Sequence, residues 1–361
     1  MKIILAGGGT GGHLFPGIAL AQEIRSRPVD SEILFLCTNR EFDLNQLGHY
    51  NFTYYPLPSP RLSFSPLFPV RLGKSLWLSL KYFKRFQPEL VIGLGGYGSV
   101  APLVAAYLKG IPIVLMEQNF LPGKITRYFS GAAREIYVQW PGSEKYFKEP
   151  SKVIVTGSPI RSFIKRLDRA TTCSEFNLSP GKKILLVLGG SQGAHALNQF
   201  MVNHLEYLNN FPDNLAIIHL TGQADYEMVR QSYGDTRIEH CVFSFCERME
   251  EVYSVADLVL SRAGALAMAE MAYLRLPSVL VPYPSAADNH QFLNAQEVQK
   301  KDAGLLIEQK NLSADTMKYI VEKVLFNDGL LQKMAESARL LAYPESASTI
   351  YLRITQLITP V

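Results

Sequence analysis

A glycine-rich loop that ends in a histidine is the first stretch of this chain that could do chemistry. The apolar run Ile3–Leu5 leads into AGGGTGGHLFP, in which Pro16 is typical of the first turn of a helix. A strand, a glycine loop and a helix in this order direct backbone N–H groups toward one point, where an anion or the polar edge of a sugar can bind. His13 lies beside that point, and its neutral imidazole can accept a proton near pH 7.

Two familiar nucleotide-binding motifs do not fit this loop. Gly7, Gly9 and Gly12 have the GxGxxG spacing of a dinucleotide site, but such a site also requires an acidic residue at the end of the second strand. The predicted second strand ends in Cys37–Asn39, without a carboxylate. A P-loop requires Lys followed by Ser or Thr after its last glycine, whereas this loop continues with His13.

The composition indicates a globular protein that stays inside the cell. With 361 residues, 47% of them hydrophobic and 19% charged, the chain is long enough for two domains. A net charge of +4 is too small to predict nucleic-acid binding. The four cysteines are scattered, so we expect free thiols and neither a zinc site nor disulfides. We expect no secretion signal, because the N-terminus starts directly in a strand without a charged and then apolar leader. We also expect no membrane span, because no apolar run reaches about 18 residues.

Apolar strands alternate with helical patterns along the whole chain, which predicts parallel sheets covered by helices on both faces. The opening pattern recurs at Lys182–Ala194, so we expect a second domain of the same type. The predicted domains are residues 1–161 and 162–341. Residues 342–361 have apolar side chains at helical spacing and are expected to pack back on the first domain. The expected strands are Ile3–Leu5, Ile33–Leu36, Leu90–Ile92, Ile113–Met116, Ile136–Val138, Val153–Val155, Ala216–Leu220, Val242–Phe245, Leu258–Leu260, Ser278–Val281 and Leu305–Ile307, and a further strand opens the Lys182–Ala194 pattern.

A basic and apolar segment lies between Asp43 and Glu89, where no acidic residue occurs. Because its first part is rich in proline, we expect a helix only from about Leu72. Basic residues interleaved with apolar and aromatic ones predict binding to a membrane surface. The alternative is an ordinary crossover helix with an apolar core face and solvated lysines. The residues predicted to meet the membrane are Leu76, Trp77, Leu80, Lys81 and Lys84.

Several motifs along nearly the whole chain, taken in order, resemble those of the MurG family. These bacterial transferases move N-acetylglucosamine from UDP-N-acetylglucosamine to lipid I and form lipid II for peptidoglycan. The motifs are GGGTGGH from Gly7, GGY from Gly95, EQN from Glu117, GGSQGA from Gly189, SRAGA from Ser261 and the segment from Asp288 to Asn294.

The resemblance implies a GT-B fold, in which two Rossmann-like α/β domains with parallel sheets face each other across a cleft. The N-terminal domain would bind lipid I and the cytoplasmic face of the cell membrane as a peripheral protein. The C-terminal domain would bind UDP-N-acetylglucosamine. The resemblance further implies roles in cell wall biogenesis, cell shape and division, with proteins of those processes as partners and without a cofactor.

The resemblance also implies donor-binding residues. Glu270 would accept hydrogen bonds from the ribose hydroxyls, although a glutamate near a helix start is also favoured by the helix dipole alone. Ser191 would receive the pyrophosphate, the backbone near Cys246 the uracil, and Arg161 would lie on the donor side. The helix start Ala265, Leu266, Ala267, Met268 and Ala269 would add contacts. His290 and Gln291 are alternatives for reading the sugar hydroxyls.

On the acceptor side, the resemblance implies that Thr10, Gly11, Gly12 and Asn119 close on the sugar and the diphosphate. His13 would take the proton from the attacking hydroxyl, or only position the acceptor by a hydrogen bond. Glu117 is the reserve base or else orients its loop. Because no Asp-x-Asp motif occurs, we expect no essential metal and assign the leaving charge to helix dipoles and backbone donors.

Two other functions are compatible with these motifs. One is a UDP-N-acetylglucosamine 2-epimerase, which shares the fold but has no use for the basic apolar segment. The other is a non-catalytic, membrane-associated binder of nucleotide sugars that acts as a scaffold.

Overall fold

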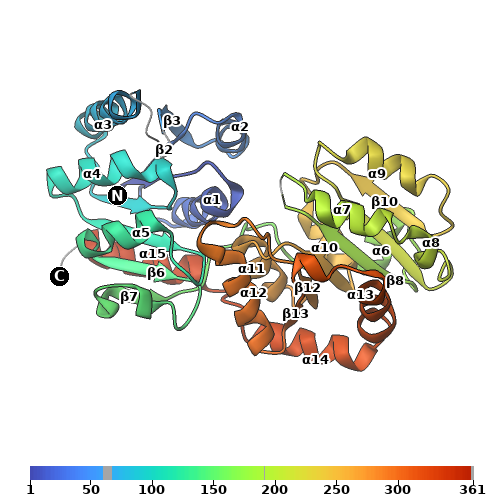
Figure 1. Cartoon of the computed structure of the whole chain (residues 1–361). Coiled ribbons are helices and arrows are strands. Elements are labelled where there is room, and N and C mark those ends of the chain that lie inside the picture. Colours follow the sequence, from blue (N-terminus) through green and yellow to red (C-terminus); the bar gives the residue numbers. More distant parts are fainter. Residues whose placement is uncertain (60–66, 191, 359–361) are drawn as a thin grey trace. The chain divides into compact units, whose positions relative to one another are not determined.

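The computed structural model describes residues 1–59, 67–190 and 192–358. The chain divides into two compact units (Figure 1). Unit 1 contains Met1–Ser162 and Tyr343–Val361, and unit 2 contains Phe163–Ala342. The last segment of the chain therefore returns to the first unit.

Unit 1 is built on a seven-stranded parallel sheet with the order β3-β2-β1-β4-β5-β6-β7. The chain winds outward from β1 in one direction and from β4 in the other, so loops following these two strands diverge at the centre of the sheet. Such a switch point forms a crevice at the carboxyl ends of the strands. The strands are β1 (Lys2–Ala6), β2 (Glu32–Thr38), β3 (Thr53–Leu57), β4 (Leu90–Gly93), β5 (Ile113–Glu117), β6 (Glu135–Val138) and β7 (Val153–Val155).

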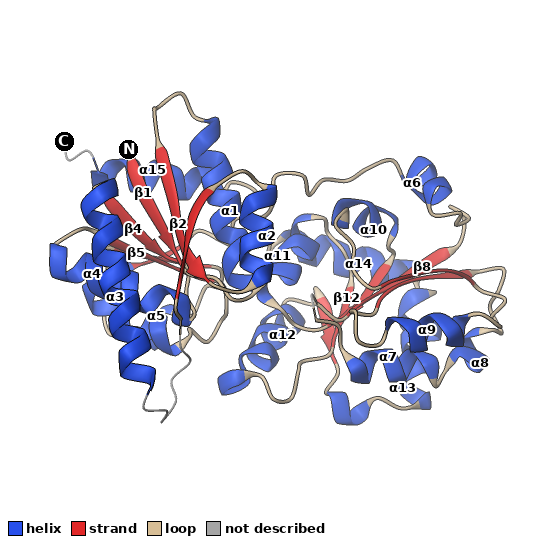
Figure 2. Cartoon of the chain, turned by 90° about the horizontal axis from the view of Figure 1, so that it is seen from above, coloured by secondary structure: helices blue, strands red, loops and turns tan. Residues whose placement is uncertain are grey.

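Helices cover this sheet because nearly all of its central strand residues are apolar and buried. Phe83 of α3, Leu103 of α4 and Phe129 of α5 share one core with the strands. Helices α1 and α15 pack against each other (Figure 2). The helices of unit 1 are α1 (Gly11–Ser26), α2 (Glu41–His49), α3 (Leu67–Phe86), α4 (Val100–Lys109), α5 (Lys124–Phe129) and α15 (Ser346–Ile358).

Two elements of unit 1 differ from the sequence prediction. Strand β3 was not predicted, and it contains Pro56. It is an edge strand, where a proline removes no hydrogen bond that a neighbouring strand needs. Helix α3 begins at Leu67 rather than near Leu72, because Pro69 lies in the first turn, where backbone N–H groups have no acceptor within the helix.

A double hydrogen bond attaches the C-terminal helix α15 to the sheet. Arg353 donates from Nε and Nη2 to the two carboxylate oxygens of Glu135, at 2.8 and 2.6 Å, and Tyr137 donates to Glu135 at 2.8 Å. Burial acts to raise the pKa of Glu135, but these donors outweigh it and leave the pKa below its ordinary value. The Arg27 guanidinium of α1 also lies 5.1 Å from the ring centre of Tyr351. These contacts explain why the last helix belongs to unit 1.

Unit 2 repeats the same winding in a six-stranded parallel sheet with the order β10-β9-β8-β11-β12-β13. Its switch point lies between β8 and β11, which pair directly. The strands are β8 (Lys183–Leu188), β9 (Leu215–Leu220), β10 (Glu239–Phe243), β11 (Leu258–Ser261), β12 (Ser278–Leu280) and β13 (Gly304–Leu306). The predicted strand Val242–Phe245 was placed too late, since β10 is an edge strand that tolerates the polar residues Glu239 and His240 at its start.

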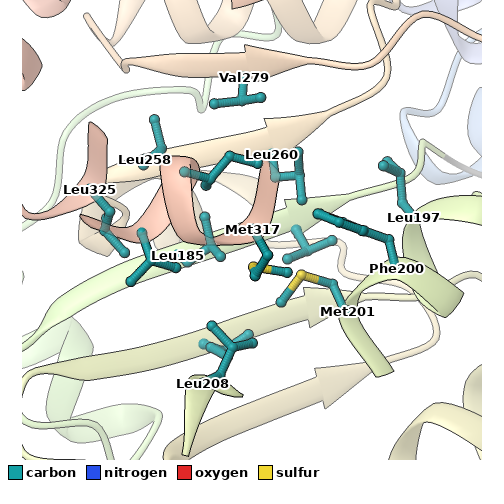
Figure 3. Packing of buried hydrophobic residues seen from close by; sticks show 14 of the residues in the cluster. Leu185, Leu197, Phe200, Met201, Leu208, Leu258, Leu260, Val279, Met317 and Leu325 are labelled. Atoms are coloured by element: carbon teal, nitrogen blue, oxygen red, sulfur yellow. The ribbon is translucent and has the colours of Figure 1, made fainter. Parts of the chain in front are cut away.

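The core of unit 2 joins the sheet to helices at both ends of the unit's sequence. Leu185 of β8 and Leu260 of β11 lie in one cluster with Phe200 of α7 and Met317 of α13 (Figure 3). The helices are α6 (Arg169–Glu175), α7 (His195–Val202), α8 (Leu205–Leu208), α9 (Tyr226–Tyr233), α10 (Met249–Val255), α11 (Ala265–Tyr273), α12 (His290–Lys300), α13 (Ala314–Lys318), a π-helix (Tyr319–Leu325) and α14 (Asp328–Arg339).

Within the described ranges, no helix combines the length and the apolar character that crossing a bilayer requires.

Candidate active site

The glycine loop of unit 1 connects β1 to α1 at the switch point. Gly7, Gly8 and Gly9 all have positive φ, at 147°, 132° and 89°. Gly7 is packed closely against the loop after β4, since a Cβ at this position would lie 2.8 Å from Cβ of Leu94. Helix α1 then begins at Gly11, with Thr10 as its N-cap residue. The N–H groups of His13 and Leu14 bond to the carbonyl of Thr10, whereas no acceptor takes those of Gly11 and Gly12 among the described residues.

His13 lies in the first turn of α1 between two glycine loops. Its Nδ1 is 3.0 Å from the hydroxyl oxygen of Thr10. A Cβ on Gly95 would lie 3.0 Å from Cδ2 of His13, so the ring rests on the backbone of the loop after β4. Only glycine leaves room for the imidazole there. The structure thus brings Thr10 and His13 together with the loop that starts at Leu94.

Glu117 at the end of β5 is buried, with an exposed fraction of 4%, and binds its own loop. One carboxylate oxygen accepts hydrogen bonds from the backbone N–H and the side-chain amide of Asn119, at 3.1 and 3.2 Å. The other accepts the N–H of Gly123 at 2.9 Å. Three donors on one carboxylate favour the loop-orienting role of Glu117 over that of a base. The two hydrogen bonds to Glu117 also fix the position of the Asn119 side chain.

Asp43 is a site residue that the sequence analysis missed. It lies in the first turn of α2, is fully buried, and accepts the N–H of Gly9 with both carboxylate oxygens. The hydroxyl of Thr38 also donates to it, at 2.5 Å. A carboxylate does therefore follow the second strand, but it comes from the next helix and turns toward the glycine loop. The signal in the sequence was an acidic residue in the first turn after that strand.

The glycine loop of unit 2 connects β8 to α7. Gly190 and Gly193 have φ values of 84° and 76°, and a Cβ on Gly193 would overlap the carbonyl oxygen of Thr221. Among the described residues, no acceptor takes the backbone N–H of Gly190 or Gln192. The predicted Ser191 lies outside the described residues. The loop can therefore present backbone donors to an anion.

A buried hydrogen-bond network supports this second loop. Asn198 donates from Nδ2 to the carbonyl of Thr221 at 2.9 Å and to Asp225 at 2.7 Å. Its oxygen therefore faces Nε2 of His219, 3.0 Å away, so that nitrogen carries the proton. Nδ1 of His219 is 3.3 Å from the hydroxyl of Tyr233. Burial lowers the pKa of His219 to about 3, so the ring is neutral.

Helix α11 follows β11 on the other side of the switch point of unit 2. It begins at Ala265 and Leu266, so their N–H groups lack acceptors within the helix. Glu270 is 2% exposed, and the Tyr253 hydroxyl donates to it at 3.3 Å. The side chains of Met268 and Ala269 are buried and that of Ala267 is half-buried.

The start of α12 carries the two predicted sugar-reading residues. Asp288 and Asn289 have φ values of 51° and 56°, which turn the chain sharply into the helix. His290 donates from Nδ1 to the carbonyl of Ala287 at 2.8 Å, and Gln291 accepts the N–H of Tyr283 with its side-chain oxygen at 2.9 Å. Both side chains are therefore oriented by the loop before the helix.

Cys246 and Arg161 complete the predicted donor set. Cys246 is half-buried, and burial raises the pKa of its thiol. Arg161 belongs to unit 1, where it is buried and its guanidinium carbon lies 4.8 Å from the ring centre of Phe15. The contacts of these two residues with a donor remain predictions.

The predicted membrane residues divide into two groups on α3. Trp77, 61% exposed, and the exposed Lys81 and Lys84 face outward, with the Lys81 ammonium 5.5 Å from the Trp77 ring centre. Leu76 and Leu80 are half-buried against the core. An open pocket of about 890 Å³ adjoins this face. Its lining consists of Trp77, Leu80, Lys81, Phe83, Lys84, Gln87, Pro88, Lys109 and Ile111.

The described residues contain no group of three or more His, Cys, Asp and Glu side chains that could hold a metal ion.

Both units match family models of known proteins. The model of the glycosyltransferase family 28 N-terminal domain matches residues 3–138, and that of the C-terminal domain matches residues 184–350. A protein of Desulforamulus reducens named UDP-N-acetylglucosamine–N-acetylmuramyl-(pentapeptide) pyrophosphoryl-undecaprenol N-acetylglucosamine transferase is 36% identical over 97% of both chains.

Two solved structures resemble the chain over nearly its full length. The crystal structure of Acinetobacter baumannii MurG has a TM-score of 0.78 and 27% identity, and covers 98% of this chain and 99% of that one. A UDP-N-acetylglucosamine 2-epimerase has a TM-score of 0.73 over 98% of this chain and 95% of its own. Its identity of 14% reflects a shared fold alone.

Proposed function

Because this chain belongs to the UDP-N-acetylglucosamine–N-acetylmuramyl-(pentapeptide) pyrophosphoryl-undecaprenol N-acetylglucosamine transferases of glycosyltransferase family 28, we propose that it makes lipid II. It is a hexosyltransferase that moves N-acetylglucosamine from UDP-N-acetylglucosamine to lipid I, in peptidoglycan synthesis. The observation that carries this function is the 36% identity over 97% of both chains. The predicted fold class, two Rossmann-like α/β units of the GT-B type, is confirmed.

We assign the donor to unit 2, where the N–H groups of Gly190 and Gln192 in the glycine loop have no acceptor among the described residues. The diphosphate would bind at this loop and at the start of α11, where the helix dipoles favour negative charge. The buried carboxylate of Glu270 would accept the ribose hydroxyls. Gln291 or His290 at the start of α12 would bind the sugar hydroxyls, as their oriented side chains suggest.

We assign the acceptor to unit 1 and the proton transfer to His13. The C4 hydroxyl oxygen of the muramyl sugar bonds to the anomeric carbon of N-acetylglucosamine, and the bond from that carbon to the diphosphate oxygen breaks. The electron pair leaves with UDP, and the hydroxyl proton passes to a ring nitrogen of His13. Attack from the face opposite UDP inverts the anomeric configuration.

Transfer of label from UDP-N-acetylglucosamine to a lipid I analogue tests this function. We expect a labelled lipid product, which His13→Ala reduces about a hundredfold or more, as is usual for loss of a general base. His49→Ala, which removes an exposed histidine of α2, is the matched control and should keep full activity. Label released as free N-acetylmannosamine would identify an epimerase, and binding without turnover would identify a scaffold.

Glu270→Ala separates donor binding from chemistry. We expect the KM for UDP-N-acetylglucosamine to rise about tenfold, because hydrogen bonds to a charged group contribute roughly 1.5–3 kcal/mol. The KM for the lipid should stay constant, since unit 2 carries this carboxylate. An unchanged donor KM would leave Glu270 with only a structural role beside Tyr253.

We further propose that the outward face of α3 binds the cytoplasmic face of the cell membrane. Its tryptophan and lysines combine an apolar anchor with attraction to anionic lipids. Co-sedimentation with vesicles of phosphatidylglycerol should fall when Lys81 and Lys84 are changed to Gln and Trp77 to Ser, and should weaken at high salt. Lys301→Gln with Lys310→Gln, on the surface of unit 2, is the control. Equal binding by both variants would refute the assignment.

A further inference from the structure

The glycine loop of unit 1 is held in place by a buried acid that the reaction itself does not use. Asp43 has no exposed surface, and its carboxylate oxygens accept the Gly9 N–H at 2.7 and 3.0 Å. Thr38 supplies a further donor. A side chain on Gly8 would overlap this carboxylate. The loop and the acid therefore fit each other closely.

A second contact binds the carbonyl group of Gly9. Arg40, directly before α2, donates from Nη1 to the carbonyl oxygen of Gly9 at 2.6 Å. The N–H and the C=O of Gly9 are thus both bound from the start of α2. The next residue is Thr10, whose hydroxyl contacts Nδ1 of His13. The hydrogen bonds to Gly9, the peptide bond from Gly9 to Thr10 and the contact between Thr10 and His13 thus link the start of α2 to the imidazole.

Burial of the Asp43 carboxylate has a free-energy cost, which indicates that the contact with the glycine loop has a function. Burying a carboxylate is unfavourable, and burial raises the pKa of Asp43, although three hydrogen-bond contacts lower it in part. The loop it binds contains Gly7, Gly8 and Gly9, which without a partner would sample many conformations. A fixed loop keeps a reacting group in place before the substrate arrives.

The orientation of the Asp43 carboxylate toward Gly9 also affects which ligand the loop can bind. In a dinucleotide site, the acidic residue after the second strand binds the ribose of the ligand. Here the carboxylate binds Gly9 instead, so the amide that could face a nucleotide phosphate is already occupied and has a negative charge beside it. The corresponding loop of unit 2 keeps the N–H groups of Gly190 and Gln192 without acceptors among the described residues.

We propose that Asp43, assisted by Arg40, is a positioning residue that fixes the acceptor loop and, through Thr10, the ring of His13. The inference rests on the proposed function of His13. It also explains why two similar glycine loops in one chain bind different ligands: the loop of unit 1 is committed to the acceptor hydroxyl, and the loop of unit 2 to the donor diphosphate.

The test uses Asp43→Asn in the full-length protein, because an amide places a donor beside the Gly9 N–H. We expect kcat to fall roughly ten- to hundredfold, as for small misplacements of a reacting group. The KM for UDP-N-acetylglucosamine should stay within about twofold, because unit 2 is unchanged. Glu41→Gln, which removes an exposed charge from the same helical turn, is the matched control.

A second variant keeps the test valid if Asp43→Asn folds poorly. Arg40 is exposed, so Arg40→Met should fold normally and still lower kcat severalfold without changing the donor KM. The ¹⁵N signals of the His13 ring, measured without substrate, should shift in both variants and not in Glu41→Gln.

Unchanged kcat and ring signals in both variants would overturn the proposal. So would an equal loss of kcat and donor affinity, which indicates general damage. If the wild-type protein shows no transfer, the proposed function fails, but the ring signals still report whether Asp43 positions His13.

Discussion

The buried histidine of unit 2 leads to a quantitative prediction about acid stability. His219 is neutral in the folded protein, because burial lowers its pKa to about 3, whereas an unfolded chain would have the ordinary value of about 6.5. As the pH falls below about 6.5, the unfolded state takes up a proton that the folded state does not bind. The free energy of unfolding must therefore decrease as the pH falls through this window, down to about 3.

The size of the effect follows from the two pKa values. Between pH 7 and pH 5, proton uptake by the unfolded ring lowers the free energy of unfolding by about 2 kcal/mol. His219→Gln removes this titration while its amide can still donate to Asn198, so the variant should lose about 2 kcal/mol less than the wild type over the same interval. Its stability at pH 7 should be lower, because the contact with Tyr233 is disturbed.

Urea unfolding at pH 7 and pH 5, followed by circular dichroism, measures both quantities. His49→Gln, at an exposed histidine of unit 1, should retain the pH dependence of the wild type. An equal pH dependence of the wild type and His219→Gln would refute the reasoning. A titration of the His219 ring near pH 6.5 by NMR would refute it as well, because a ring that protonates in the folded state is not shielded from water.

Three further predictions concern single contacts. Gly193→Ala should abolish most UDP binding measured by calorimetry, because its Cβ would overlap the carbonyl oxygen of Thr221. Gly190→Ala has open space around its Cβ and should cost only about 1–2 kcal/mol of strain in the left-handed conformation. Equal effects of the two substitutions would contradict this steric cause. Arg353→Met should lower the free energy of unfolding of unit 1 by about 1–2 kcal/mol, because Glu135 loses two donors. An unchanged midpoint of urea unfolding would show that water replaces these donors. Glu117→Gln should lower kcat and leave the pH dependence of kcat unchanged, since an amide accepts fewer N–H groups than a carboxylate. Loss of the acidic limb of that pH dependence would instead identify Glu117 as the base.

Local patterns in the sequence were sufficient to predict most of the two parallel sheets. Strands that are buried on both faces are continuous apolar runs, and the glycine loops after β1 and β8 are visible because few other residues adopt positive φ. His13 could be recognised because it directly follows the glycine loop, at the predicted start of a helix. The identities of the sugar and of the lipid came only from the family resemblance, because hydrogen-bond donors on a loop do not specify one ligand.

Contacts between distant residues were decided by the tertiary structure alone. The edge strand β3 forms in spite of Pro56 because its neighbour supplies the pairing. The sequence pattern indicated that the last segment packs on the first domain, but not that Arg353 and Glu135 make the contact. The carboxylate of Asp43 reaches Gly9 only after α2 has packed beside the glycine loop. Sequence patterns report which residues are apolar or flexible over a few positions, whereas the partner of a buried charge depends on how separate elements meet in space.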